Sequence, residues 1–227
     1  MSLEETLDKK KEPSSFRLVI TLTLIGLCSG AALAAVYVKT KPMIDANKAA
    51  FLEEKLVEIF KGQTIVTQKL IPADGKMVVA QSGDGSPGVL AVYTADGKPL
   101  AYGLIGKGQG YAADGVELLF AYDPIKEVVV GMRALDSKET PGFGTKMGEE
   151  PFQSNFKALS FKKKVVLVDF GKKSAAHEVD AISGATVTSA AVVDAANNVR
   201  DKWLPRLPKP GSEPAFQKKA IASEGEE

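Results

Sequence analysis

Cysteine, histidine and tryptophan each occur only once in this chain of 227 residues. The single cysteine, Cys28, excludes an internal disulfide framework and any zinc or iron–sulfur site built from cysteines of this chain alone. The single histidine, His177, argues against a histidine-rich metal site, so we expect no metal ligands. Any redox chemistry would therefore need an organic cofactor or a partner protein.

An excess of charge of either sign is also missing. The 29 Lys and Arg residues face 28 Asp and Glu residues, and the formal net charge is +1. Domains that bind nucleic acid usually carry a clear basic excess that neutralises phosphates. The composition thus gives no electrostatic reason to expect nucleic acid as a partner.

Charged residues are missing altogether from residues 18–38, which read LVITLTLIGLCSGAALAAVYV. About 20 apolar residues in a helix cross the hydrocarbon core of a bilayer, and a helix satisfies its own backbone groups there. The stretch predicts a transmembrane helix over 18–38, preceded by a cytoplasmic tail over 1–17.

Two other interpretations of this stretch remain open. Ala32-Leu33-Ala34 resembles a signal-peptidase site, which would make the stretch a cleaved signal peptide. Cys28 would suit a lipoprotein only if a small residue preceded it, and Leu27 stands there. The apolar run continues to Val38 and is followed by lysines, which favours a retained span. A large domain outside the cytoplasm is expected. Charge does not fix this orientation, because basic residues flank both ends and long domains translocate largely regardless of charge.

Residues 39–84 are predicted to form a stalk helix and a connector. Leu52, Leu56, Ile59 and Phe60 recur at helical spacing, and Gly62 marks the end of the helix.

Residues 85–204 are predicted to form the main domain, which begins with four strands over 88–134. Asp96-Gly97 and Asp123-Pro124 each separate two apolar runs, which is typical of hairpins. Two hairpins imply an antiparallel sheet. In GKGQGY, the glycines lack the strand-to-helix context of a dinucleotide fold, so a turn is expected rather than a phosphate loop.

The rest of the domain is predicted to be a loop, a helix over 151–159, a short buried strand over 165–168 and a long final helix. Residues 205–227 are rich in proline and polar residues and are predicted to be disordered. The expected class is α+β, an antiparallel sheet with packed helices behind one N-terminal transmembrane helix. The aromatic side chains expected in the core are Phe120, Tyr122, Phe170 and Trp203.

Small residues and hydroxyls are crowded just before the final helix, in DAISGATVTS. Serine and threonine often cap helices, and glycine permits a tight turn, so capping alone would explain the pattern. A helix N-terminus also favours phosphate through its free N–H groups and its partial positive charge. A threonine hydroxyl there could hold a phosphate, either by hydrogen bonds or as a phosphodiester.

DAISGAT resembles the D-x-x-[ST]-G-A-T flavinylation motif of the FMN-binding domain family. In that family a flavin transferase takes FMN from FAD and esterifies its phosphate to the last threonine of the motif. The resemblance implies covalent FMN on Thr186, with Thr188 as a weaker alternative. The implied recognition and turn residues are Asp180, Ser183, Gly184 and Ala185.

Two further blocks resemble the same family in the same order. GQGYAADGVELLFAYD resembles its Gly-Tyr segment and the strand that follows, and KETPGFGTKM resembles its E-T-P-G-L-G-x-K-[IM] loop. Phe143 replaces the usual leucine. The resemblance implies that the loop packs on the flavin. Lys146 is proposed from its residue type alone as an electrostatic partner of the ring that gains charge on reduction. The implied cofactor-binding residues of the loop are Glu139, Thr140, Pro141 and Gly142.

One N-terminal span, a large outer domain and a motif near the C-terminus together resemble the G-subunit family of Rnf complexes, ion-translocating ferredoxin:NAD oxidoreductases. The resemblance implies an electron-transfer subunit of a multisubunit translocase in the inner membrane, with its main domain outside the cytoplasm and no stand-alone turnover or catalytic residue of its own. The implied partners are the A, B, C, D and E subunits, the flavinylated D subunit above all, and the flavin transferase.

Two alternatives stay open. The C subunit of the sodium-translocating NADH:quinone reductase shares all three blocks. A non-catalytic anchored domain that only binds a partner would also fit a corner that serves as a helix cap.

Overall fold

The computed structural model describes residues 15–81, 86–111, 115–137, 139 and 144–216. The chain forms two compact units, and the boundary between them follows Asn47. The elements in chain order are α1 (Ser15–Ile59), β1 (Ile65–Ala73), β2 (Lys76–Val79), β3 (Val89–Thr94), β4 (Pro99–Gly108), β5 (Val116–Asp123), β6 (Val128–Ser137), η1 (Gly144–Gly148), α2 (Glu150–Gln153), η2 (Ser154–Phe156), β7 (Leu159–Ser160), β8 (Val166–Val168), β9 (Glu178–Asp180), α3 (Thr186–Trp203) and η3 (Leu204–Arg206).

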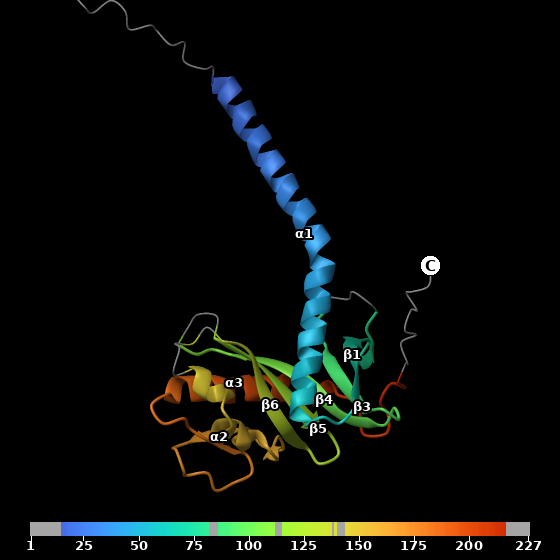
Figure 1. Ribbon diagram of the computed structural model, residues 1–227, viewed down its shortest axis with the longest axis vertical. Helices are drawn as coiled ribbons and strands as arrows, with labels where there is room; N and C mark the ends of the chain where they lie inside the picture. The colour runs from blue at the N-terminus through green and yellow to red at the C-terminus, as the bar shows by residue number, and fades with distance from the viewer. Residues whose placement is uncertain (1–14, 82–85, 112–114, 138, 140–143, 217–227) are drawn as a thin grey trace, which may run out of the picture. The chain divides into compact units, whose positions relative to one another are not determined.

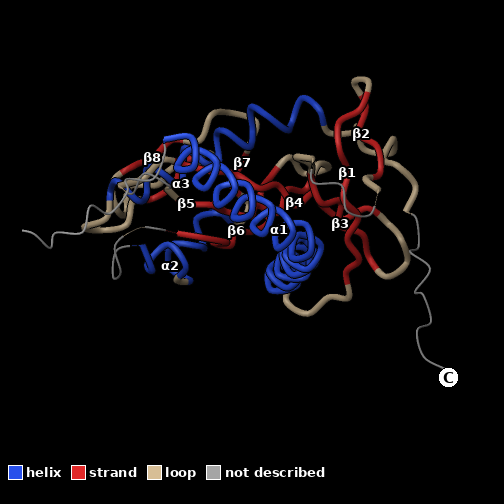
Figure 2. The backbone as a smooth tube through the Cα atoms, turned by 90° about the horizontal axis from the view of Figure 1, so that it is seen from above, coloured by secondary structure: helices blue, strands red, loops and turns tan. Residues whose placement is uncertain are grey.

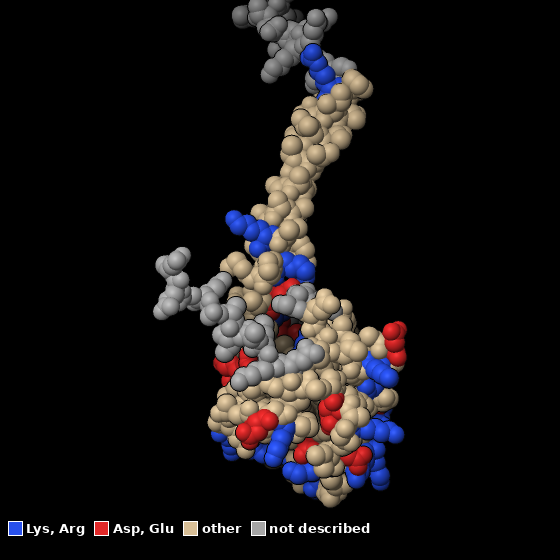
Figure 3. All heavy atoms as spheres, turned by 90° about the vertical axis from the view of Figure 1, so that its right-hand side faces the viewer, with Lys and Arg blue, Asp and Glu red and all other residues tan. Residues whose placement is uncertain are grey.

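The first unit consists of the N-terminal part of α1. Among the described residues, α1 is the single helix whose length and composition suit a membrane span. Figure 3 shows a stretch of this helix free of charged side chains, with basic side chains at both ends. A separate stalk helix was expected after the apolar run, but one helix continues through both segments to Ile59.

The second unit contains an antiparallel sheet in the order β2-β1-β3-β4-β5-β6-β7. Both predicted hairpins are confirmed, as β3–β4 and β5–β6. Gly97 takes a φ of 77° in the first turn, in the left-handed region that glycine enters without steric cost. The α+β class with an antiparallel sheet is therefore confirmed.

The sheet extends beyond the predicted strands at both edges. The expected connector contains β1 and β2, which pair with each other and, through β1, with β3. At the other edge, the helix predicted over 151–159 is present but ends earlier than predicted. Helical turns end at Phe156, Ala158 takes a φ of 63°, and Leu159 starts β7, which pairs with β6.

Helix α3 packs on one face of the sheet, as Figure 1 shows. The face predicted for it is confirmed, since Val192, Ala196, Val199 and Trp203 are all buried. Two glycines of β4 let it approach closely. A Cβ on Gly108 would lie 1.8 Å from the Ala191 carbonyl oxygen, and one on Gly106 would lie 2.4 Å from Val199 Cγ2. The prediction of a turn at these glycines is wrong, because they are strand positions that face a helix.

The last turns of α1, which belong to the second unit, pack on a separate apolar cluster of the same sheet. Leu56 and Ile59 contact the sheet where Gly103 and Gly131 leave room for them. Glycines 103 and 106 differ by an odd number of positions along β4, so their Cα–H groups face opposite sides. The sheet therefore lies between the end of α1 and α3, an arrangement that can be followed from above in Figure 2.

Arg133 of β6 links the end of α1 to α2. Its guanidinium donates to the Glu58 carboxylate at 3.0 Å and to Gln153 Oε1 at 2.9 Å. Burial opposes ionisation of Glu58, but hydrogen bonds from Lys55 and Arg133 outweigh it and lower the pKa of Glu58.

We expect Arg133→Ala to lower the free energy of unfolding by about 1 kcal/mol near neutral pH, because solvent screens the partly exposed pair. A group with a lowered pKa stabilises the fold above its unfolded value, here 4.5, and loses that effect as the pH falls through the folded value. The cost of Arg133→Ala should therefore shrink below pH 4.5. Urea unfolding at neutral and acidic pH measures it, and an equal cost at both would contradict the ion-pair explanation.

The segment after α3 differs from the predicted disordered tail. The Tyr93 hydroxyl donates to the Pro214 carbonyl oxygen at 3.1 Å, and the rings of Tyr93 and Phe216 lie 5.2 Å apart. Leu207, Pro214 and Phe216 therefore contact the domain, while 217–227 lie outside the described residues.

Candidate functional site

The corner between β9 and α3 is a tight turn built from the small residues of the motif. Gly184 takes a φ of 77°, and the Ala185 N–H donates to the Ile182 carbonyl oxygen at 3.0 Å. Ala185 is the N-cap residue, so Thr186 is the first residue of α3. The turn residues suggested by the resemblance thus place Thr186 at a helix N-terminus.

The hydroxyls of the corner have different surroundings. Ser189 is buried, accepts from the Ile182 N–H at 2.8 Å and donates to the Ala185 carbonyl oxygen at 2.9 Å. The N-cap residue makes no side-chain hydrogen bond, so a capping hydroxyl does not explain the small residues and hydroxyls of the corner. Thr186 and Ser183 are exposed, and neither hydroxyl makes a hydrogen bond within the described part of the chain. The Thr186 hydroxyl is accessible for modification.

Thr188, two residues further on, points into the protein. Its hydroxyl donates to Glu139 Oε2 at 2.9 Å, and the Tyr111 N–H donates to Glu139 Oε1 at 2.9 Å. Tyr111 and Glu139 belong to two of the blocks that resemble the FMN-binding family, and Thr188 follows the third block by two residues, so the three segments meet at one carboxylate. The expected loop residues Thr140, Pro141 and Gly142 lie outside the described residues.

Asp180 holds the segment that leads into the corner. Its Oδ1 accepts from the backbone N–H groups of Lys172 and Lys173, and its own N–H donates to Asn155 Oδ1 at 3.1 Å. Asn155 is buried and also donates to the Phe152 carbonyl oxygen. Asp180 thus has a clear conformational role within the motif.

Replacing Asp180 by alanine removes an acceptor shared by two N–H groups. We expect Asp180→Ala to speed hydrogen exchange at the Lys173 amide by about tenfold, which corresponds to a loss of roughly 1.4 kcal/mol. The effect at the Lys172 amide should be smaller, because that N–H also donates to the Asp169 carbonyl oxygen. Asp180→Asn keeps one side-chain oxygen and should retain most of the protection. Equal exchange in Asp180→Ala and the unmodified sequence would show that the carboxylate does not hold this turn.

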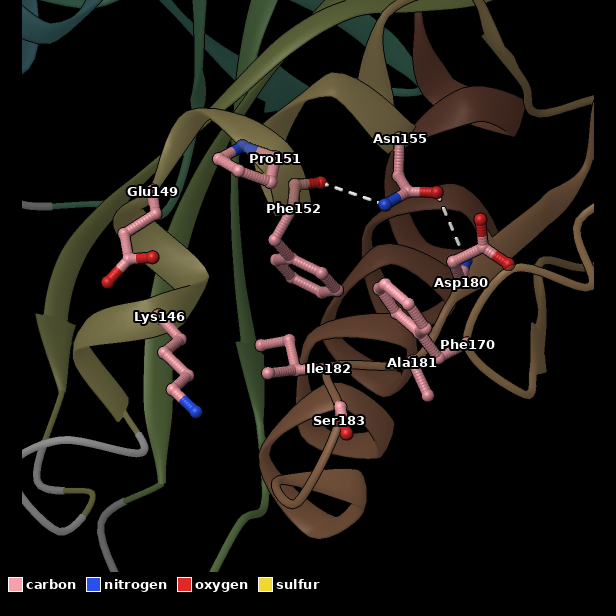
Figure 4. Close-up of a pocket in the computed structure, with 10 residues that line it drawn as sticks. All are labelled: Lys146, Glu149, Pro151, Phe152, Asn155, Phe170, Asp180, Ala181, Ile182 and Ser183. Atoms are coloured by element: carbon pink, nitrogen blue, oxygen red, sulfur yellow. Dashed lines mark hydrogen bonds between the residues drawn. The ribbon is translucent and has the colours of Figure 1, made fainter.

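A pocket of about 240 Å³ opens beside the motif. Figure 4 shows Phe152, Phe170 and Ile182 lining it, with Lys146 on one side and Ser183 at its edge. Phe170 was predicted to lie in the core, but its side chain is 71% exposed. The remaining lining residues are Glu149, Pro151, Asn155, Asp180 and Ala181.

Phe152, Asn155 and Phe170 were missed as site residues. They lie outside the three recognisable blocks, and no sequence pattern marks them as neighbours of the motif. Phe170 had one available signal, because it stands in a polar stretch, DFGKKS, that is more typical of a surface than of a core.

Known proteins resemble this chain over most of its length. The profile of the FMN-binding domain family matches residues 110–201. The G subunit of the ion-translocating oxidoreductase complex of Methanosarcina acetivorans is 27% identical, covering 82% of this chain and 92% of that protein. The G subunit of the proton-translocating ferredoxin:NAD(+) oxidoreductase complex of Clostridium ljungdahlii is 29% identical, covering 81% of this chain and 88% of that protein.

Two solved structures also align with this fold. They are NqrC of Shewanella oneidensis, at 21% identity, and the C subunit of the Na(+)-translocating NADH-quinone reductase of Parabacteroides distasonis, at 25%. Each has a TM-score of 0.47, and they cover 61% and 60% of this chain and 78% and 74% of those chains, respectively.

The sequence relatives decide the assignment. The G subunit of the ion-translocating oxidoreductase complex of Haemophilus influenzae is 32% identical, covering 77% of this chain and 83% of that protein. With this identity over most of both proteins, the chain belongs to the family of G subunits of ion-translocating oxidoreductase complexes.

Proposed function

We propose that this chain carries FMN, esterified through its phosphate to the Thr186 hydroxyl, and relays electrons between ferredoxin and NAD couples within a membrane ion-translocating complex. The observation that carries the proposal is the exposed Thr186 hydroxyl at the start of α3, without a protein partner in the described chain. It lies within the segment matched by the FMN-binding domain profile. The names of the family members support the redox complex and its ferredoxin and NAD couples.

The attachment transfers the FMN phosphoryl group from a pyrophosphate to a threonine hydroxyl. A flavin transferase would break the pyrophosphate bond of FAD, join the FMN phosphorus to Thr186 Oγ1 and release AMP, with the threonine proton passing to a base of the transferase. The chain supplies an accessible hydroxyl and a helix N-terminus whose N–H groups favour the phosphate charge. The exposed Ser183 and Gly184 leave the turn open to a modifying enzyme.

The residues around the corner fit a flavin. Phe152 and Phe170 offer aromatic rings and Ile182 an apolar surface, which suit a flat ring system. Lys146 lines the same pocket, where a cation would stabilise the charge that a flavin gains on reduction. When bound, the flavin supplies one- and two-electron redox chemistry, while the protein supplies position and electrostatics.

The loop residues implied by the resemblance complete the proposed site. Glu139, Thr140, Pro141 and Gly142 would border the flavin, and Asp180, Ser183, Gly184 and Ala185 would shape the attachment turn. We assign no catalytic residue and no metal ligand to this chain, and turnover would belong to the assembled complex.

The proposed arrangement has a cytoplasmic tail over 1–17, an inner-membrane span over 18–38 and an FMN-binding domain outside the cytoplasm. That domain comprises the predicted 85–204 together with β1 and β2, which lie in the expected connector over 39–84 and belong to the same sheet. The apolar part of α1 supports the single span. Covalent attachment would prevent loss of FMN where free flavin is not replenished. The partners would be the A, B, C, D and E subunits, with the flavinylated D subunit as an electron-transfer neighbour, and the flavin transferase during maturation.

Electron transfer is tested on the complex purified from its native membrane. Reduced ferredoxin, added without oxygen, should bleach the absorbance of the flavin on this chain, and NAD should restore it. A matched complex with Thr186→Val should lose that part of the signal. A flavin on this chain that stays oxidised with reduced ferredoxin present would contradict the relay.

A further inference from the structure

The contact between Glu139 and Thr188 joins segments that lie 49 residues apart in the sequence. The Glu139 side chain is buried, at 9% exposure, and Thr188 is 3% exposed. Both carboxylate oxygens accept a hydrogen bond, one from the Thr188 hydroxyl and one from the Tyr111 N–H. A hydrogen bond to a charged group is worth more than one between neutral groups, especially where water is excluded.

The glycines around Glu139 leave its side chain little freedom. A Cβ on Gly110 would lie 2.2 Å from Glu139 Oε1, and one on Gly144 would lie 2.5 Å from Glu139 Cβ. Glycine at these positions therefore has a packing reason, which is to let two chain segments close around the glutamate. The carboxylate is confined to the position in which it reaches Thr188.

Glu139 also compensates for a missing cap. Helix α3 has no side-chain hydrogen bond at its N-cap residue and no acidic residue in its first turn. A carboxylate bonded to Thr188, in that turn, supplies negative charge near the positive end of the helix. Thr186 lies two residues before Thr188, so the same turn determines where its hydroxyl is presented.

We propose that Glu139 is a positioning residue: through Thr188 it holds the first turn of α3, and thereby presents the Thr186 hydroxyl for flavin transfer. The inference rests on the proposed function, but it assigns Glu139 a task separate from any contact with the flavin. The hydrogen bond joins Glu139 to the helix turn that directly follows the attachment motif.

The test uses Thr188→Val, which keeps the shape of the side chain and removes the donor, with Thr188→Ser as the conservative rescue. The full chain is produced with and without the flavin transferase. We expect Thr188→Val to slow flavin incorporation about tenfold or more and Thr188→Ser to restore it. The Ile182, Ala185 and Ser189 amides donate hydrogen bonds within the corner. In the flavin-free protein, Thr188→Val should speed hydrogen exchange at these amides by a similar factor.

A matched control separates positioning from general loss of stability. Leu119→Ala removes a buried side chain of the cluster that packs against the end of α1. It should destabilise the fold at least as much as Thr188→Val while leaving incorporation near normal under folding conditions. Equal slowing in both variants, or normal incorporation and normal corner exchange in Thr188→Val, would overturn the proposal.

Gly110→Ala is a second variant that disturbs the contact between Glu139 and Thr188. It leaves the Glu139 and Thr188 side chains unchanged but forces the carboxylate from its position. Gly110→Ala should therefore also slow flavin incorporation, and it provides the test if Thr188→Val does not fold. Normal incorporation in Gly110→Ala would then count against the proposal. If the unmodified sequence took up no flavin, the proposed function would fail, while the exchange rates would still decide whether Glu139 holds the corner.

Discussion

Thr186→Val is expected to abolish covalent flavin attachment completely. An ester needs the hydroxyl oxygen, and valine has the shape of threonine without it. Because Thr186 is exposed and makes no hydrogen bond within the described chain, the free energy of unfolding should change by less than about 0.5 kcal/mol. Flavin fluorescence in a denaturing gel, after production with the transferase, measures attachment directly.

The controls test the position and the chemistry separately. Thr186→Ser keeps a hydroxyl at the same place and should retain flavin. Thr67→Val, on strand β1 of the same domain, removes a hydroxyl away from the corner and should leave the fluorescence unchanged. A fluorescent band in Thr186→Val would mean that another residue carries the flavin, with Thr188 the next hydroxyl to examine.

Gly108→Ala is expected to destabilise the domain strongly. Its Cβ would lie 1.8 Å from the Ala191 carbonyl oxygen and 2.7 Å from the carbonyl carbon, both of which belong to the backbone of α3. No side-chain rotation relieves such a clash, so α3 must move away from the sheet or β4 must distort. We expect a loss of about 3 kcal/mol in the free energy of unfolding.

Urea unfolding of the full chain in detergent, followed by circular dichroism, gives this number. Gly148→Ala is the matched control, because a Cβ there would meet nothing within 4 Å, and the backbone of Gly148 does not need a positive φ. Because α3 carries the attachment turn, Gly108→Ala should also lower flavin incorporation. A stability equal to that of Gly148→Ala would show that the helix does not pack on β4 as described.

The central hairpins and the last helix could be predicted because their signals are local. Asp96-Gly97 marks one turn, Asp123-Pro124 the other, and apolar residues three and four apart mark the buried face of α3. Strand β1 gave no such signal, since Thr67, Gln68 and Lys69 break its alternation and its partners lie on either side of it in the sheet. Its formation depends on the edge offered by β3.

The structural roles of the glycines were the hardest to predict from the sequence. Gly106 and Gly108 looked like turn residues, but the structure uses their missing side chains to bring a helix against a strand. A sequence does not distinguish a glycine that bends the chain from one that makes room for a neighbour. The same ambiguity applies to Gly110, which makes room for Glu139.

Part of the candidate site could be predicted from the sequence and part could not. Thr186 and its turn residues could be located from one short motif, because they are consecutive in the chain. The pairing of Glu139 with Thr188 could not, since it depends on the packing of three separate segments. The exposure of Phe170 likewise follows from the loop between β8 and β9, which carries the ring out of the core to the edge of the pocket.

The central claim is that the Thr186 oxygen is bonded to a flavin phosphate, and mass spectrometry of the peptide spanning residues 174–200 tests it most directly. The peptide from the natively produced chain should be heavier by one FMN less one water, and fragmentation should place the added mass on Thr186. An unmodified peptide, or the added mass on another residue, would contradict the claim.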